Sequence, residues 1–280
     1  GQILGGTSPV EGALTLYGPR ERLLQLRGSP LRTGDRTTGA LLVLTDVTRL
    51  HQLEGMRRDF VANASHELKT PVTAIKASAE TLAGGDLDHE SVTRFSRIIS
   101  RQADQLVALI EDLLELTRLE HEQERSTLER ERTDVAQVVW AAVEVCAAEA
   151  RQKDMVLTVR CPEGLQAPLN AGQAQRALVN LIDNAVKYGP AHSEIVVEAS
   201  RQGERLRVDV RDQGPGIAPE HQQRIFERFY RVDKSRSRKL GGTGLGLSIV
   251  KHVAQAHGGE VSVESSPGHG SVFTLWFPGA

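Results

Sequence analysis

The chain has 280 residues and a mass of 30.6 kDa, which is enough for two domains and part of a third at roughly 100 to 200 residues per domain. It carries 34 Lys and Arg residues against 36 Asp and Glu residues, so the formal net charge is −2 and no basic excess points to nucleic acid. Hydrophobic residues make up 39% and charged residues 25%, a balance typical of a globular protein and not of a disordered one.

The cysteine content and the length of the apolar runs indicate in which cellular compartment the chain is expected. Cys146 and Cys161 form no C-x-x-C pair, so neither a disulfide framework nor a zinc site is expected, and a reducing cytosol is favoured. The longest apolar runs, 40–44 and 138–142, fall far short of the ~20 residues that a membrane helix needs. Because the chain opens at Gly1 without Met, we expect the cytoplasmic portion of a longer protein, with room for an inner-membrane anchor upstream.

The first part of the chain reads as strands. Apolar stretches at 13–17, 23–26 and 40–44 are separated by turns that contain Gly and Pro, which predicts a small antiparallel sheet. The sequence Asp46-Val47-Thr48 then leads at once into a helical pattern. This succession resembles the C-terminal end of a PAS sensor domain, at about half the usual length, while an arbitrary β-meander explains the stretch equally well.

A helical region follows and has one break. Apolar residues advance in alternating steps of 4 and 3 along 68–82, and the same alternation runs along 99–117 after a glycine-containing turn at 84–86. Two such helices form an antiparallel hairpin. A lone hairpin leaves much of each apolar seam in water, so we expect two chains to pair into a four-helix bundle and the protein to be a homodimer.

The rest of the chain alternates helices and strands after a charged stretch at 118–132, which reads as a solvated helix end and linker. Helices are predicted at 134–150, 174–188 and 245–257, and strands at 155–159, 195–199, 206–211, 260–264 and 271–277. This pattern predicts an α/β sandwich with a mostly antiparallel sheet covered by helices on one face. The expected whole is a multidomain α+β protein with a PAS-like part at 1–48, a hairpin at 49–121, a linker at 122–133 and the sandwich at 134–280.

Two segments of the sandwich carry polar residues that suit a nucleotide. Asn180, Asn184 and Lys187 step by 4 and 3, so they project from one helical face. An amide oxygen is a ligand that Mg²⁺ accepts when phosphates supply the rest, and Lys187 would add a charge for those phosphates. Asp212 stands at a strand end before a Gly-x-Gly turn, where its carboxylate can accept a hydrogen bond from an amine such as that of adenine.

A glycine-rich segment at 241–247 leads into a helix, whose free N–H groups and positive dipole end suit a polyphosphate. It matches neither the Rossmann fingerprint nor the Walker pattern. The basic stretch 228–239 before it is either a lid that meets the triphosphate or a solvated loop, and charge alone supports both readings. Taken singly, each of these segments is an ordinary turn or helix face, so their order along the chain has to decide.

That order, with the Phe-rich segment 225–230 between the turn and the glycine-rich loop, resembles the N, G1, F and G2 boxes of bacterial sensor histidine kinases. Their ATP-binding domain has the Bergerat fold of gyrase-type ATPases. The resemblance covers 134–277 and implies ATP and Mg²⁺, with Asn184 on the metal and Asp212 on the adenine amine. It implies further nucleotide contacts at Asn180, Lys187, Tyr188, Gly214, Gly216, Arg231, Gly242, Thr243, Gly244, Leu245 and Gly246. Gyrase-like members have Glu where this chain has Asn180, whose amide cannot activate water, so ATP should await another nucleophile.

The first helix offers that nucleophile. A neutral imidazole such as His66 is competent near pH 7 if a neighbour such as Glu67 takes its second proton, although a lone His-Glu pair on a helix is more often simply solvated. Pro71 should kink the helix just beyond. The sequence Ser-His-Glu-Leu-Lys-Thr-Pro resembles the H box of the same family, which implies His66 as the phosphoacceptor, Glu67 as its acid/base partner and Thr70 as the holder of the water that dephosphorylates the partner. Asn170, where many relatives carry Asp, is a departure that leaves the local helix cap in question.

The expected protein is therefore a sensor histidine kinase that autophosphorylates His66 from ATP and transfers the phosphoryl group to an Asp of a response regulator receiver domain, with dephosphorylation of that regulator as a second activity. One alternative is a Bergerat-fold ATPase or conformational clamp, against which the His66-Glu67 pair and Asn180 argue. Another is a non-catalytic scaffold that binds nucleotide, against which the complete set of nucleotide residues argues.

Overall fold

The structure, a computed structural model, describes residues 10–18, 21–33, 36–85, 87–125, 128–233 and 241–279. It comprises two compact units, Gly1–His66 and Glu67–Ala280. Among the helices within the described ranges, none combines the length and the apolar character that a membrane crossing requires.

The first unit contains the predicted antiparallel sheet. Its strands are β1 (Val10–Leu16), β2 (Arg22–Thr33) and β3 (Arg36–Asp46), paired in that order. Helix α2 (Thr48–Ala83) begins directly after β3. Thr48 donates its hydroxyl to Asp46 Oδ1 at 2.6 Å and accepts the N–H of Leu23 at 2.8 Å, so the Asp-Val-Thr junction fastens the start of the helix to β2.

The predicted hairpin is present. After α2, helix α3 (His89–Arg125) begins with Asp88 as its cap, since Asp88 Oδ1 accepts the N–H of Ser91 at 2.9 Å. Helix α2 continues through Pro71, which has no N–H to donate to the carbonyl of Glu67, and the kink expected there stays a prediction.

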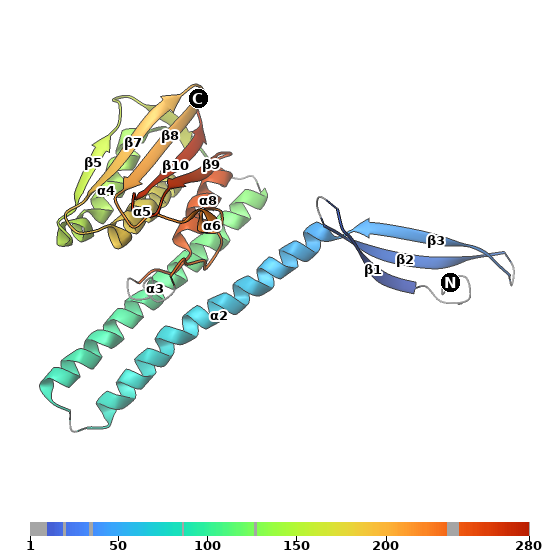
Figure 1. The fold of residues 1–280 in the computed structure, drawn as a ribbon, viewed down its shortest axis with the longest axis horizontal. Helices are drawn as coiled ribbons and strands as arrows, with labels where there is room; N and C mark the ends of the chain where they lie inside the picture. Colours follow the sequence, from blue (N-terminus) through green and yellow to red (C-terminus); the bar gives the residue numbers. More distant parts are fainter. Residues whose placement is uncertain are drawn as a thin grey trace. The chain divides into compact units, whose positions relative to one another are not determined.

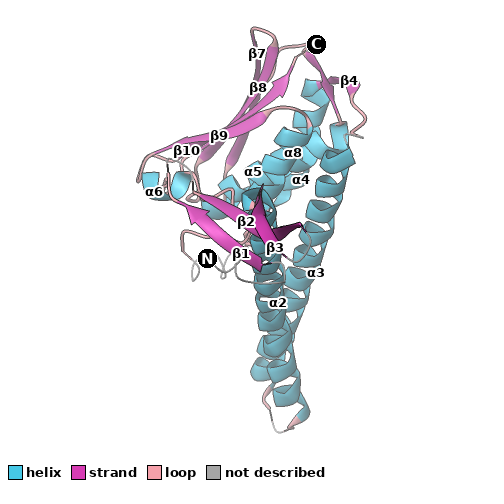
Figure 2. Cartoon of the chain, turned by 90° about the vertical axis from the view of Figure 1, so that its right-hand side faces the viewer, coloured by secondary structure: helices cyan, strands magenta, loops and turns pink. Residues whose placement is uncertain are grey.

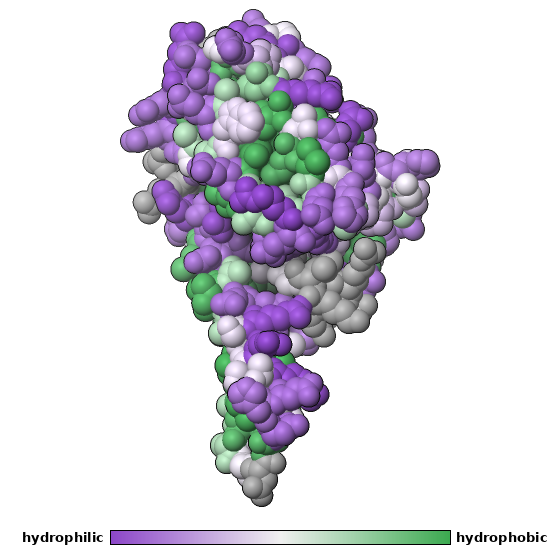
Figure 3. Space-filling view, turned by 90° about the vertical axis from the view of Figure 1, so that its left-hand side faces the viewer, coloured by the Kyte–Doolittle hydropathy of each residue, from purple (hydrophilic) through white to green (hydrophobic). Residues whose placement is uncertain are grey.

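Helix α3 has two apolar faces, and the sequence predicted one of them. Leu109, Leu116 and Leu119 are buried, and α3 packs against α8 (Gly246–Ala256) of the sandwich. Ile110 of the predicted seam remains 44% exposed. Figure 3 shows apolar patches along the hairpin towards its turn. The stretch from 118 is therefore not only a solvated helix end, because α3 runs on to Arg125 and Leu119 is covered completely.

The α/β sandwich has the predicted layers. Its sheet has the order β5-β7-β8-β10-β9, in which only β5 and β7 run parallel, and the helices lie on one face of it (Figures 1 and 2). The strands are β5 (Val156–Arg160), β7 (Glu194–Gln202), β8 (Arg205–Asp212), β9 (Glu260–Ser265) and β10 (Ser271–Pro278), and the remaining helices are α4 (Val135–Gln152), α5 (Ala171–Tyr188) and the single turn α6 (Pro219–Gln222). The inner face of the sheet and the facing sides of the helices bury aliphatic residues, which explains how a chain with 4% aromatic residues forms a core.

A two-stranded sheet of β4 (Glu131–Asp134) and β6 (Gln166–Leu169) was not predicted. It leads into α5, where Asn170 Oδ1 accepts the N–H of Gln173 at 3.1 Å. Asn170 therefore caps α5 as an Asp would, and the question that this departure raised is answered. The backbone N–H of Asn170 also donates to Nε2 of the fully buried His257 at 3.0 Å.

Candidate active site

A cavity of about 500 Å³ opens in the second unit between α5, the turn after β8, the loop before α8 and one side of α3. Most of the nucleotide residues expected from the sequence line it: Asn180, Asn184, Lys187, Tyr188, Asp212, Gly216, Arg231, Gly242, Thr243, Gly244 and Gly246. Gly214 and Leu245 are buried beside it instead, and their backbone N–H groups bond to Asp212 and Thr243.

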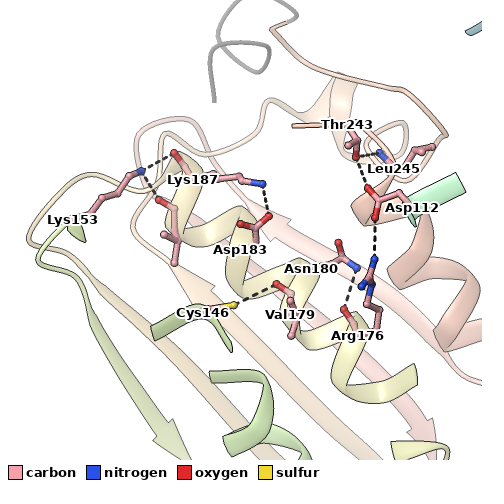
Figure 4. A network of polar contacts seen from close by, with 11 residues as sticks. Asp112, Cys146, Lys153, Arg176, Val179, Asn180, Asp183, Lys187, Thr243 and Leu245 are labelled. Atoms are coloured by element: carbon pink, nitrogen blue, oxygen red, sulfur yellow. Dashed lines mark hydrogen bonds and ion pairs between the residues drawn. The ribbon is translucent and has the colours of Figure 1, made fainter. Parts of the chain in front are cut away.

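The face of α5 supplies one wall, as the 4-3 spacing predicted. Asn180 donates its amide N–H to the carbonyl of Arg176 at 3.0 Å (Figure 4). A Cβ on Gly246 would lie 2.8 Å from the amide oxygen of Asn180, so the first residue of α8 has to be glycine for the two helices to approach this closely. The close approach of α5 and α8 thus sets the width of the cavity at its glycine-rich end.

Lys187 carries a fixed positive charge at the same wall. Its Nζ lies 2.7 Å from Asp183 Oδ2 on the previous turn. Burial by itself would lower the pKa of Lys187, but the charge and hydrogen bond of Asp183 outweigh it and the pKa is raised. Lys153 holds the end of this helix, because its ammonium donates to the carbonyl of Lys187 at 3.0 Å (Figure 4). The ammonium of Lys187 is therefore charged at neutral pH and held at the cavity wall by Asp183.

Asp212 lies at the end of β8, where the sequence placed it. Its Oδ1 accepts the N–H of Gly214 at 2.7 Å, which fixes the carboxylate at the cavity wall. Burial raises the pKa of Asp212, partly opposed by hydrogen bonds from the N–H groups of Gly214 and Ser271. Ile217, Ile225 and Phe273 line the cavity as well, so a flat apolar ring with an amino group fits between them and the carboxylate.

Gly216 and Gly244 are among the cavity glycines whose backbone conformation favours glycine. Gly216 has a φ of +72°, and a Cβ there would lie 1.9 Å from the carbonyl oxygen of Ser266. Gly244 has a φ of +76°, and a Cβ would lie 3.0 Å from Cα of Phe229. Side chains at these positions would push the loops apart, so both glycines are structural requirements of the cavity.

Arg231 connects the cavity to the helix that carries His66. Its guanidinium lies 3.0 Å from Glu67 Oε2, and its side chain is only 7% exposed. The basic stretch that contains Arg231 was predicted as a lid or a loop, and its residues 234–240 lie outside the described residues. Arg228, at its start, forms an ion pair with Glu120 of α3.

Asp112 of α3 is a cavity residue that the sequence did not reveal. Its Oδ2 accepts the hydroxyl of Thr243 at 2.7 Å, and its Oδ1 lies 3.3 Å from Nη2 of Arg176 (Figure 4). Burial raises the pKa of Asp112, partly opposed by the hydrogen bond from Thr243 and the charge of Arg176. No spacing pattern distinguishes this acid from the exposed acids beside it on an amphipathic helix, so only the fold identifies it.

The three residues of the H-box motif to which the resemblance gives a role lie on one helix. His66 is exposed on α2 within the first unit, which is compatible with the phosphoacceptor role expected from the sequence. Glu67 and Thr70, which are partly buried, belong to the second unit. The side chains of His66 and Thr70 are four residues apart and project from the same side of the helix.

The cavity fits a Mg²⁺–nucleotide on these observations. It combines an apolar wall ending in a carboxylate, a glycine-rich loop at a helix N-terminus, and cationic side chains. Mg²⁺ keeps most of its phosphate and water ligands, so one amide such as that of Asn184 suffices on the protein side.

Comparisons with known proteins agree with this reading. Residues 170–280 match the family described as histidine kinase-, DNA gyrase B- and HSP90-like ATPase, and residues 56–122 match the His Kinase A (phospho-acceptor) domain. The sensor-like histidine kinase SenX3 of Mycolicibacterium smegmatis is 38% identical over 266 residues, which are 95% of this chain and 69% of the relative. The phosphate regulon sensor protein PhoR of Pseudomonas aeruginosa is 38% identical over 269 residues, 94% of this chain and 55% of the relative. The crystal structure of full-length ShkA in complex with AMPPNP has a TM-score of 0.56 and 28% identity, and the match covers 79% of this chain and 46% of that one.

A phospho-acceptor hairpin joined to an ATP-binding sandwich defines a protein kinase that acts on histidine. The chain belongs to the sensor histidine kinases of two-component systems. The predicted family and the predicted multidomain α+β fold are thereby confirmed.

Proposed function

We propose that this protein transfers the γ-phosphoryl group of ATP to His66 and from there to an aspartate of a response regulator receiver domain. The observation that carries the proposal is the convergence of Asn184, Lys187, Asp212 and the glycine-rich loop on one cavity. A gyrase-type hydrolase would need a general base at Asn180, whose amide instead donates to a helix carbonyl. The nucleotide is therefore held for a nucleophile other than water.

The nucleotide residues divide the work by chemistry. Asp212 accepts the hydrogen bond of the adenine amine, and Asn184 offers its amide oxygen to Mg²⁺, which neutralises phosphate charge when bound. Lys187, with its raised pKa, and Arg231 add positive charge along the phosphates. Phosphoryl transfer depends mostly on positioning and charge neutralisation, so these contacts with ATP are sufficient to prepare its γ-phosphoryl group for transfer.

On the acceptor side the exposed imidazole of His66 attacks the γ-phosphorus with one ring nitrogen. A nitrogen–phosphorus bond forms, the bond to the bridging oxygen breaks, and ADP leaves. Glu67 takes or holds the proton of the second ring nitrogen, which stabilises the charge on the imidazole. Transfer to the regulator then exchanges this phosphoramidate for an acyl phosphate on the aspartate.

The assembly that this chemistry needs is a homodimer of hairpins. Support comes from the apolar side chains that stay exposed on α3, Val107, Ile110 and Leu114, which a second hairpin would cover.

We further propose that Thr70 positions the water for dephosphorylation of the regulator. The proposed domains are 1–48, 49–121 and 134–280, with a linker at 122–133. Together they would form the cytoplasmic portion of a longer sensor that is anchored in the inner membrane. The chain spans about two thirds or less of the curated relatives it matches.

The proposal is tested by incubation with γ-labelled ATP. The wild-type protein should acquire a label that is acid-labile and alkali-stable, as a phosphoramidate is. His66→Gln should acquire none while it still binds ATP. His51→Gln, at another exposed histidine of α2, is the matched control and should be labelled normally. Label that survives in His66→Gln refutes the acceptor, and steady phosphate release without any phosphoprotein would indicate an ATPase instead.

A further inference from the structure

Two carboxylates of the hairpin reach groups that line the nucleotide cavity. Asp112 of α3 bonds to Thr243 of the glycine-rich loop and pairs with Arg176 of α5, while Glu67 of α2 pairs with Arg231. All of these contacts lie within the second unit. In each, an acidic oxygen lies against a donor or cation at the cavity wall.

The Asp112 contact is more than a surface ion pair. Its side chain is 13% exposed, and burial of the carboxylate raises its pKa even though Arg176 is adjacent. Its two oxygens serve different partners, one in the loop before α8 and one on α5 (Figure 4). A partly buried carboxylate with two partners positions the elements that it joins, so Asp112 fastens α3 to both sides of the glycine-rich end of the cavity.

A polyphosphate in this cavity would meet that carboxylate. Asp112 lines the cavity together with Gly242, Gly244 and Gly246, where the phosphates are proposed to lie. Two anions in a poorly hydrated space repel one another, and both need the same hydroxyl and the same positive charge. The contact of α3 with the cavity and the binding of phosphates therefore oppose each other.

We propose that Asp112 is a clasp that nucleotide phosphates displace, so that binding of a nucleoside triphosphate weakens the docking of α3 on the ATP-binding domain. This inference rests on the proposed function, because it takes the cavity to be the nucleotide site. The exchange makes no covalent bond: phosphate oxygens replace the carboxylate oxygens at Thr243 and Arg176. By linkage, docking of α3 lowers nucleotide affinity by the same factor by which nucleotide weakens docking.

The apolar part of the contact, formed by Leu116 and Leu119, is not touched by this exchange. Asp112 therefore affects how strongly α3 docks on the ATP-binding domain and not the place at which it docks. Release of Asp112 lowers the cost of moving the ATP-binding domain along or away from α3, which is the motion that must precede phosphorylation of a residue outside the cavity.

Asp112→Asn in the full chain tests the clasp, because it keeps the shape of the side chain and removes the charge. The affinities for Mg²⁺–AMPPNP and for adenosine are measured by calorimetry. Asp112→Asn should bind AMPPNP roughly three- to tenfold more tightly than wild type and bind adenosine equally well, since adenosine has no phosphates to compete. Glu111→Gln, at the exposed acid that directly precedes Asp112, is the control and should change neither affinity.

Hydrogen exchange reports docking independently. In wild type, AMPPNP should speed exchange in peptides that cover 109–120, and in Asp112→Asn that exchange should already be fast without nucleotide. Asp112→Ser, which also removes the charge, is measured alongside so that the result does not depend on the folding of one variant. Unchanged or weaker AMPPNP binding in the folded variants overturns the clasp. A wild-type protein that binds neither AMPPNP nor adenosine overturns the proposed function instead.

Discussion

Glu67 and Arg231 form an ion pair, with 3.0 Å between Oε2 and Nη2, that joins the residue after His66 to the wall of the nucleotide cavity. The arginine is the more buried partner, with 7% of its side chain exposed against 25% for the glutamate. Bound phosphates would attract the same guanidinium. In the proposed mechanism, Glu67 therefore has to share or release Arg231 before its carboxylate is fully available to the proton of His66.

Glu67→Gln should lower the rate of autophosphorylation by roughly 10²- to 10⁴-fold, because a general base usually contributes that much. Nucleotide affinity should be unchanged or slightly higher, since Arg231 loses a competing anion. Both are measured with the full chain, the rate by label incorporation and the affinity by calorimetry. Glu80→Gln, an exposed acid in an ion pair with Lys76 on the same helix, should behave as wild type. An undiminished rate in Glu67→Gln removes the residue from the mechanism.

Asn184→Ala should weaken nucleotide binding in the presence of Mg²⁺ by roughly tenfold or more and leave binding in EDTA almost unchanged, because only the metal-bound form uses the amide oxygen. Titrations with AMPPNP, with and without Mg²⁺, measure this difference. Gln175→Ala, on the same helix and outside the cavity lining, is the amide control. Equal losses with and without Mg²⁺ would assign Asn184 to the nucleotide itself and not to the ion.

Thr70→Ala should spare autophosphorylation and slow dephosphorylation of the receiver domain that the kinase phosphorylates, because the hydroxyl is assigned to the attacking water and not to His66. The two rates are followed separately by label incorporation and by loss of label from the regulator. Thr73→Ala, whose hydroxyl donates to the carbonyl of Lys69 at 2.8 Å, removes a hydroxyl from the same helix and serves as the control. Parallel losses of both activities in Thr70→Ala would indicate a structural role.

His252→Gln should reduce the acid sensitivity of the fold. Burial, with the charges of Arg228 and Lys251, lowers the pKa of His252 to about 4 although Glu120 lies 3.8 Å away, because Glu120 already pairs with Arg228. A lowered pKa means that the unfolded chain binds the proton more readily, so stability is present above pH ~6.5 and is lost as the pH falls towards 4. Between pH 7.5 and 5 the wild type should lose about 2 kcal/mol from this residue.

Urea unfolding at the two pH values measures that loss, which the variant should lack. His269→Gln, at an exposed histidine, should keep it. If the free energy of unfolding of His252→Gln depends on pH as that of the wild type does, His252 is not the cause of the loss of stability at low pH.

Patterns within short stretches of sequence predicted those site residues whose placement depends only on neighbouring residues in the chain. The steps between Asn180, Asn184 and Lys187 fix their common face whatever else the chain does. The glycines before α8 and the carboxylate at the end of β8 likewise follow from turn and helix-end chemistry. Hence most of the nucleotide residues expected from the sequence lie at the cavity, whereas Asp112, Arg176 and the apolar wall were not among them.

Contacts between distant segments were not predictable. Asp112 lies 131 residues before Thr243, and Glu67 lies 164 residues before Arg231, so no periodicity relates them. Strand β4 was missed for another reason: its sequence Glu-Arg-Thr-Asp has no apolar residue, and pairing with β6 alone makes it a strand.

The short connection between α3 and β4 limits how far the ATP-binding domain can travel. Helix α3 ends at Arg125 and β4 begins at Glu131, so the intervening chain reaches about 20 Å when fully extended. A domain on so short a tether stays at millimolar effective concentration around the hairpin even after docking loosens. Within an assembled dimer, diluting the sample should therefore leave the phosphorylation rate unchanged.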